Sequence, residues 1–201
     1  MKVEISKRSV GRPREFDAQL ALDAAMEVFW RQGYEGTSLT ELTTAMRLSR
    51  PSLYAAFGNK EELFHKVLDR YGEHMAFMAT ALEEPVARDA IEALLRGFVA
   101  SATDPRTPTG CLTVQGALAS GPDADEIRAV LAARRLAGEA NLRARLQRAH
   151  RSGDLAADAN PPDFARYVST LIQGIAVQAA GGASRAQLNR VVDIALRAWP
   201  D

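Results

Sequence analysis

The stretch TSLTELTTAMRLSRPSLYAAF, residues 37–57, holds two short helical patterns separated by a three-residue break. In the first pattern, Ser38 and Glu41 form an S-x-x-E capping box, in which each side chain binds a backbone N–H at the start of a helix. The apolar residues that follow share one helical face: Leu39, Leu42 and Met46. The pattern therefore predicts a short helix that ends at residues 47–49.

The second pattern begins at Ser49, whose hydroxyl can cap a helix, and has Pro51 in its first turn, where the missing N–H costs nothing. Leu53 and Phe57 are expected to point inward. The side chains left on the outer face are Arg50, Ser52, Tyr54 and Ala55. Two short helices joined in this way are typical of a helix-turn-helix, whose second helix lies in the major groove of DNA. The sequence therefore predicts DNA binding.

Flanking segments extend this motif into a small domain. A longer helical pattern begins after Asp17, a plausible N-cap, and ends at Gly33. After the second helix, Gly58 stops the chain, and residues 59–62 (Asn-Lys-Glu-Glu) begin another helix with a second capping box. We therefore expect three helices closed by a fourth.

Residues 17–70 resemble the N-terminal domain of TetR-family transcriptional repressors. The motifs that carry the resemblance are GY at 33–34, TSL at 37–39, SRPSLYAAF at 49–57 and NKEELF at 59–64. The resemblance implies an all-α protein with a helix-turn-helix domain at 17–62 and a helical ligand-binding and dimerisation domain at 63–201. It also implies a homodimer on a near-palindromic double-stranded DNA operator, released by an unknown small-molecule inducer.

One position departs from the family pattern. The residue before Leu48 is commonly glycine in that family, whereas this chain has Arg47. Either Arg47 adopts a left-handed conformation at a cost of about 1 kcal/mol, or the turn is not left-handed. In both cases its guanidinium is expected near DNA.

Individual roles on DNA follow from side-chain chemistry. We expect Arg50 to read guanine, because a guanidinium matches its O6 and N7 atoms, and Pro51 and Ala55 to touch thymine methyl groups. The expected phosphate contacts are Thr37, Ser49, Ser52, Tyr54 and Lys60. Two alternatives stay open: Thr37 and Ser49 act only as caps, and Tyr54 packs half-buried.

The first sixteen residues form an expected basic arm. The basic residues among the first fourteen, set against the single acid Glu4, are Lys2, Lys7, Arg8, Arg12 and Arg14. The run Gly-Arg-Pro-Arg at 11–14 is typical of an arginine hook in an A·T-rich minor groove, with Arg12 and Arg14 as DNA contacts. A solvated basic tail explains it equally well.

Composition narrows the remaining possibilities. The 25 Lys+Arg and 25 Asp+Glu residues balance, so any DNA affinity must be local. A single cysteine excludes an intramolecular disulfide and a CxxC zinc site, and no apolar run reaches the length of a membrane span. We expect a cytoplasmic protein with no metal, no cofactor and no membrane partner. An enzyme is the remote alternative, since GxGxxG, P-loop and HExxH motifs are missing.

Beyond residue 70 the pattern stays helical, giving about nine helices in all. The fourth is expected to continue to about Leu82. Matched apolar faces on the fourth, fifth and sixth helices suggest an inducer pocket lined by Phe77, Met78, Phe98, Cys111, Leu112 and Gln115. The alternative is that these residues are plain core. For Cys111, a redox or soft-metal role with His74 and nearby methionines competes with simple packing.

The last two helices are the expected dimer surface, because they carry more apolar side chains than a peripheral hairpin needs. The residues are Val168, Leu171, Ile172, Ile175, Leu188, Val191, Val192, Ala195 and Trp199. The alternative is that they form the core of a monomer. A transcriptional activator or an architectural DNA-binding protein also remains open, since the sequence does not separate these from a repressor.

Overall fold

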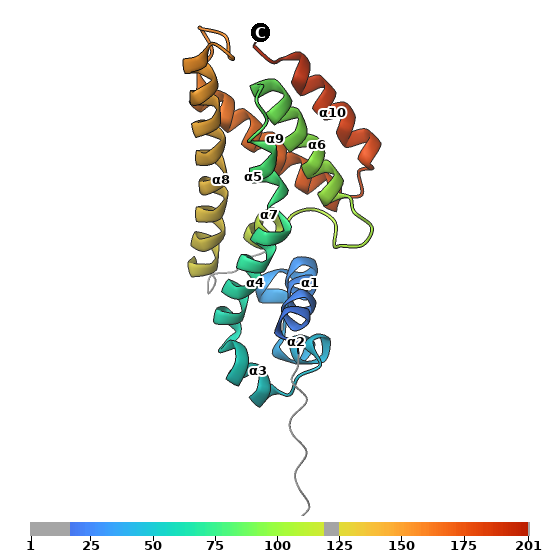
Figure 1. Ribbon diagram of the computed structural model, residues 1–201. Coiled ribbons are helices and arrows are strands. Elements are labelled where there is room, and N and C mark those ends of the chain that lie inside the picture. Colours follow the sequence, from blue (N-terminus) through green and yellow to red (C-terminus); the bar gives the residue numbers. More distant parts are fainter. Residues whose placement is uncertain (1–16, 119–124, 201) are drawn as a thin grey trace, which may run out of the picture.

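The computed structural model describes residues 17–118 and 125–200, and in these ranges every regular element is a helix (Figure 1). The helices are α1 (Ala18–Gly36), α2 (Leu39–Met46), α3 (Arg50–Phe57), α4 (Lys60–His74), α5 (Phe77–Ala81), α6 (Ala87–Ala102), α7 (Leu112–Leu118), α8 (Asp125–Ser152), α9 (Pro161–Ala180) and α10 (Arg185–Arg197). This confirms the all-α prediction. The expected fourth helix is divided by a turn at residues 75–76, so that α5 is a separate short element.

Helices α1 to α4 form a small head around aromatic side chains. Phe29 on α1 is fully buried, and its ring lies 4.9 Å from that of Phe64 on α4. Leu53 and Phe57 bury the inner face of α3 against the same core. The predicted domain boundary at residue 62 falls within the first turn of α4, because that helix closes the head and then continues into the rest of the molecule.

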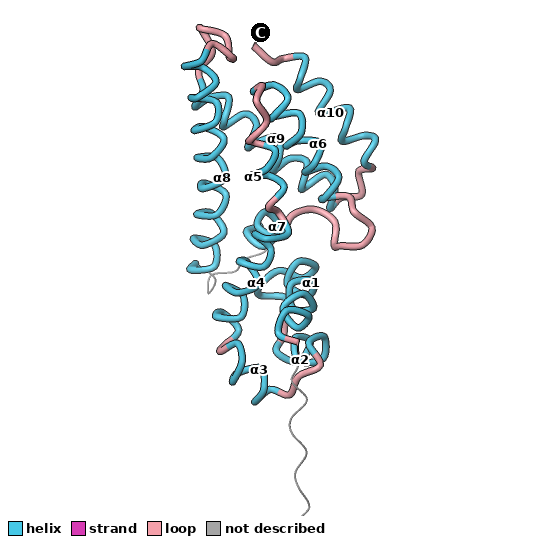
Figure 2. Tube along the Cα trace, viewed as in Figure 1, coloured by secondary structure: helices cyan, strands magenta, loops and turns pink. Residues whose placement is uncertain are grey.

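Helices α5 to α10 form the body, a bundle in which α8 and α9 pack side by side and α6 lies against both α9 and α10. In Figure 1, α3 lies at one end of the molecule and the C-terminus at the other. Figure 2 shows the loop between α6 and α7 reaching outward on the side that faces the head. The body therefore holds α3 at the free end of the molecule.

The helix starts follow the capping signals of the sequence. Capping boxes are formed by Ser38 with Glu41, by Asn59 with Glu62 and by Ser184 with Gln187. The carboxylate of Asp17 accepts hydrogen bonds from two backbone N–H groups of α1. Each cap satisfies N–H groups that have no partner within the helix, which fixes where the helix begins.

A buried arginine and a distant aspartate organise the junction of α5, α6 and α8. The guanidinium of Arg145, 6% exposed, donates to the carbonyls of Leu82, Glu84 and Pro85 at 2.8–3.1 Å. Asp154 lies 3.8 Å from it and also accepts the Ala87 N–H at 2.7 Å. Because Val86 offers no side-chain cap, Asp154 supplies the cap of α6 from far along the chain.

Within the described residues, no helix is both long enough and apolar enough to cross a membrane.

Candidate nucleic-acid interface

Helix α3 separates an anchoring face from an open face. Ser49 caps it by accepting the Ser52 N–H at 3.3 Å, and Pro51 lies in its first turn. Leu53 is fully buried and Phe57 is 4% exposed, as predicted. The predicted DNA contacts at the outer surface are Arg47, Ser49, Arg50, Pro51, Ser52 and Tyr54. A continuous set of donors and small side chains thus faces away from the core.

The guanidinium of Arg50 is held by a neighbouring helix. Its Nη2 atom donates to Thr40 Oγ1 at 3.0 Å, and both residues are exposed. Arginine carries five N–H donors, so this contact leaves most of them available. Sequence reasoning missed Thr40 because ten positions separate it from Arg50, and only the angle between α2 and α3 brings the two together.

Arg47 ends α2 in a left-handed conformation, with φ 54° and ψ 39°. Its N–H donates to the Thr44 carbonyl at 3.2 Å, and the Leu48 N–H donates to the Thr43 carbonyl at 3.0 Å. This pair of bonds is the Schellman ending that usually has glycine at its left-handed position. Of the two readings of Arg47, the structure supports the strained left-handed turn.

The predicted phosphate contact at Thr37 is not supported. Thr37 is 1% exposed, and its hydroxyl donates to the Gly33 carbonyl at 2.7 Å. Gly33 has φ 72° and interrupts the helical backbone of α1, which leaves its carbonyl free to accept this bond. The Thr37 side chain therefore stabilises the end of α1. The N-cap of α2 is Ser38 and not Thr37.

Lys60, at the start of α4, is partly buried beside an aromatic ring. Its ammonium lies 4.5 Å from the centre of the Tyr34 ring, a cation–π distance. Burial lowers the pKa of Lys60, although Glu35 and Glu41 oppose that shift. Burial also raises the pKa of Tyr34, so the ring stays neutral under the cation at ordinary pH. The basic arm at 1–16, with Arg12 and Arg14, lies outside the described residues.

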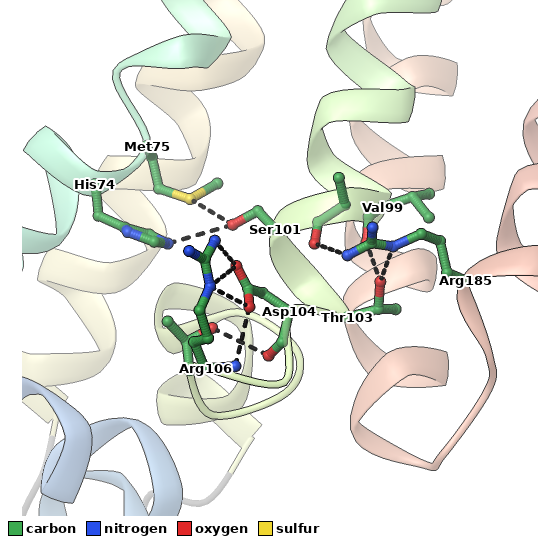
Figure 3. Close-up of polar contacts among 10 residues, drawn as sticks. His74, Met75, Val99, Ser101, Thr103, Asp104, Arg106 and Arg185 are labelled. Atoms are coloured by element: carbon green, nitrogen blue, oxygen red, sulfur yellow. Dashed lines mark hydrogen bonds and ion pairs between the residues drawn. The ribbon is translucent and has the colours of Figure 1, made fainter.

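The end of α4 ties the head to the body. Ser101 Oγ on α6 lies 3.3 Å from His74 Nε2 and 3.8 Å from Met75 Sδ (Figure 3). Two residues after Ser101, Thr103 Oγ1 accepts a hydrogen bond from Arg185 of α10 at 3.0 Å, as the same figure shows. Side chains from α4, α6 and α10 thus connect the head to the last helix.

A cavity of about 200 Å³ lies beside this junction. Of the predicted inducer contacts, Met78, Phe98 and Cys111 line it. The other three do not. Phe77 packs against Gly97 of α6, where a Cβ would come within 2.9 Å of its ring, and Leu112 is core. Gln115 lies against Gly110, and its side-chain amide oxygen is buried and has no hydrogen-bond partner among the described residues.

Cys111 is buried and belongs to a short chain of polar contacts. The Tyr71 hydroxyl donates to Cys111 Sγ at 3.2 Å, and Thr113 Oγ1 lies 3.2 Å from the same sulfur. Burial, with the neighbouring cysteine, raises the pKa of Tyr71 well above its ordinary value. Over the described ranges, His, Cys, Asp and Glu side chains form no group of three suited to a metal ion.

Most of the predicted dimer residues are buried by their own chain. The residues that are 6% exposed or less, and so form core in the single chain, are Val168, Ile175, Leu188, Val192 and Ala195. Ile172 lines the cavity, and Trp199 packs on Phe164 with ring centres 5.6 Å apart. Leu171 and Val191 remain at the surface of α9 and α10. The prediction therefore chose mainly residues of the inner stripe of each helix, because the inner and outer stripes are both apolar.

The surface of α9 and α10 carries a second apolar stripe. Exposed hydrophobic side chains lie at Val177 (46%), Val191 (40%) and Ile194 (60%). Val177 and Val191 border a groove that also contains Leu171 and Gly174, and a Cβ at Gly174 would meet nothing within 4 Å. An exposed apolar surface of this kind is typical of an interface with another protein chain.

A helix-turn-helix head with an open α3, carried by a helical body that contains a cavity, defines a DNA-binding transcriptional regulator. Comparison with known families gives the particular one. Residues 21–67 match the model of bacterial regulatory proteins of the tetR family, and residues 85–195 match the tetracyclin repressor-like C-terminal domain. The chain belongs to the TetR family. This family consists of DNA-binding regulators, so the chain is a regulator and not an enzyme.

Relatives agree along nearly the whole chain. The HTH-type transcriptional repressor ComR of Escherichia coli K12 is 35% identical over 198 residues, covering 97% of this chain and 94% of that protein. BdcR, another repressor of that organism, is 32% identical over 130 residues, 63% of this chain and 66% of BdcR. A cysteine mutant of the regulator CifR, solved with 26-bp operator DNA, is 44% identical to this chain, with a TM-score of 0.90. The match covers 94% of this chain and 100% of that chain.

Proposed function

We propose that this protein is a repressor that binds a near-palindromic operator as a homodimer and releases it when a small molecule enters the cavity of the body. The observation that carries the proposal is the open face of α3, with exposed Arg50 and Tyr54 on one side and buried Leu53 and Phe57 on the other. The similarity to operator-bound CifR supports it. The proposed compartment is the cytoplasm, where the chromosome is accessible.

On DNA, α3 enters the major groove and Arg50 reads a guanine, with Thr40 fixing the direction of its guanidinium. Pro51 makes apolar contact with a thymine methyl group. The phosphate contacts that position the helix are proposed for Arg47, Ser49, Ser52, Tyr54 and Lys60. The arm adds Arg12 and Arg14 to the phosphate or minor-groove contacts.

The dimer forms through the outer stripe of α9 and α10, which contains Leu171, Val177, Val191 and Ile194. A twofold pairing of this stripe with itself is isologous, so one apolar surface is sufficient for both chains. The pairing sets the distance between the two α3 helices. That distance decides whether both reach successive major grooves, about 34 Å apart on B-form DNA.

The position of the cavity explains how a bound small molecule would release the operator. Met75 lines the cavity at the end of α4 and also contacts Ser101 at the junction. A molecule that fits better when this end of α4 has shifted favours the conformation in which the heads are wrongly spaced for DNA. Affinity for the two conformations must differ for release to occur.

The experiment that tests the proposal is selection of bound genomic fragments by the purified protein, followed by a reporter fused to the best site. Repression of the reporter supports the proposal. Activation, or binding without any effect on transcription, would contradict it in favour of an activator or an architectural protein.

A further inference from the structure

One edge of the cavity, formed by α8, carries ionisable side chains. Those that line it are Arg134, Arg135 and Glu139. Arg134 donates to Asp69, and Glu139 accepts from Arg166 at 2.8 Å. In the part of the chain that the structure describes, no carboxylate lies within ion-pair distance of Arg135. Arg134 and Arg166 are each paired with a carboxylate, so the positive charge of Arg135 is the one among the described side chains that is not neutralised at this edge.

The guanidinium of Arg135 is already oriented. Its Nη1 atom donates to the Thr113 carbonyl on α7 at 2.6 Å, and this contact uses one of its five N–H donors. Thr113 also lines the cavity, and so do Cys111 and Tyr71, which are linked to it through hydrogen bonds at the sulfur. The polar groups of the cavity therefore continue from Arg135 along one wall.

Other parts of the lining are apolar. They come from α4, α5, α6 and α8 and include Leu68, Met75, Met78, Phe98 and Leu142. A ligand that matches this arrangement has a hydrocarbon body and one anionic group. A carboxylate bound to a guanidinium forms short, charge-assisted bonds, and partial burial strengthens them because less water competes.

We propose that the cavity binds a small organic carboxylate, with the carboxylate on Arg135 and the hydrocarbon body against the apolar wall. This inference rests on the proposed function, because it uses the same cavity and adds the chemical class of the inducer. The volume of about 200 Å³ lies below the ~300–1,000 Å³ of drug-sized sites, so the ligand is small.

The test compares matched acids and neutral amides on the full-length protein. Benzoate, benzamide, hexanoate and hexanamide are titrated by calorimetry, with inorganic phosphate as a control for non-specific anion binding. We expect each acid to bind at least about tenfold more tightly than its amide, which corresponds to about 1.4 kcal/mol. Equal affinities, or failure of both acids to bind at millimolar concentration, would overturn the inference.

Two arginine variants on the same helix locate the effect. Arg135→Gln removes the charge but keeps a donor for the Thr113 carbonyl, and it should abolish the preference for acids. Arg143→Gln changes an exposed arginine outside the cavity and should leave the preference intact. A preference that survives in Arg135→Gln, or that is lost equally in both variants, contradicts the assignment to Arg135.

Operator binding, measured on the same samples, separates this inference from the proposed function. If the protein binds its operator and a neutral compound releases it while acids do not bind, the carboxylate inference fails and the proposed function stands. If acids bind through Arg135 but no operator is found, the proposed function fails and the ligand class stands.

Discussion

Single residues decide both the local backbone and the reading of DNA in the head. Arg47 is the clearest case, since it is the one residue other than glycine with positive φ in the described ranges. The sequence left two possibilities open there, a strained left-handed conformation of Arg47 or a turn that is not left-handed. It did not decide between them, because the handedness depends on how α2 and α3 pack and not on residue 47 alone.

The variant Arg47→Gly should have a free energy of unfolding about 0.5–1 kcal/mol higher than that of the parent protein. Glycine relieves the left-handed strain, and its greater freedom in the unfolded chain offsets part of the gain. The control Ala45→Gly, two residues earlier inside α2, should lower the free energy of unfolding by about 1 kcal/mol. Urea denaturation measures both. A loss of stability in Arg47→Gly would show that the left-handed turn carries no strain.

Arg50→Ala should reduce discrimination between operator variants by about 1–3 kcal/mol at the base pair that Arg50 reads. Lys60→Ala should instead weaken all sequences to a similar extent and lower the salt slope by about one, as expected for a phosphate contact. Fluorescence anisotropy over a salt series distinguishes the two effects. Unchanged sequence preference in Arg50→Ala would remove Arg50 from base reading.

At the scale of elements, caps and apolar periodicity were sufficient to place most helices. Asn59 with Glu62, for example, marks the start of α4 in the sequence and in the structure. Two features had no local signal. The turn at residues 75–76 divides a continuous helical pattern, and the cap of α6 comes from Asp154, which lies 67 residues away from Ala87. Long-range contacts of this kind cannot be read from spacing.

Asp154→Ala should destabilise the protein by about 2 kcal/mol. It removes the cap of α6 and the carboxylate nearest to the buried guanidinium of Arg145. Asp158→Ala, an exposed position in the same connection, should change stability by less than about 0.5 kcal/mol. Thermal or urea unfolding checks the pair. Equal effects of the two substitutions would show that Asp154 does not hold this junction.

At the scale of the whole molecule, the proposed operator binding depends on two heads held at a fixed distance. The sequence indicated that the last two helices carry surplus apolar surface, but most of the residues it selected, such as Val168 and Val192, lie on the inner stripe. Periodicity gives the angle between stripes on one helix. It does not say which stripe meets the body of the same chain, because that depends on where the other helices pack.

Val191→Glu should convert the protein to a monomer and weaken operator binding by about 100-fold, since the two heads would no longer bind as a linked pair. Val191 is 40% exposed on the outer stripe, so the substitution should leave the monomer folded. Leu136→Glu, at a position 61% exposed on α8, should leave the dimer intact. Analytical ultracentrifugation gives the oligomeric state, and a dimeric Val191→Glu protein would place the interface elsewhere.

The proposed function depends on sequence-specific binding of the exposed face of α3 to duplex DNA. The most direct measurement is binding of the purified, ligand-free protein to a pool of random duplexes at moderate ionic strength, with selection and sequencing of the bound fraction. We expect enrichment of a near-palindromic site, and loss of that enrichment in Arg50→Ala. A bound fraction with the same composition as the starting pool would contradict it.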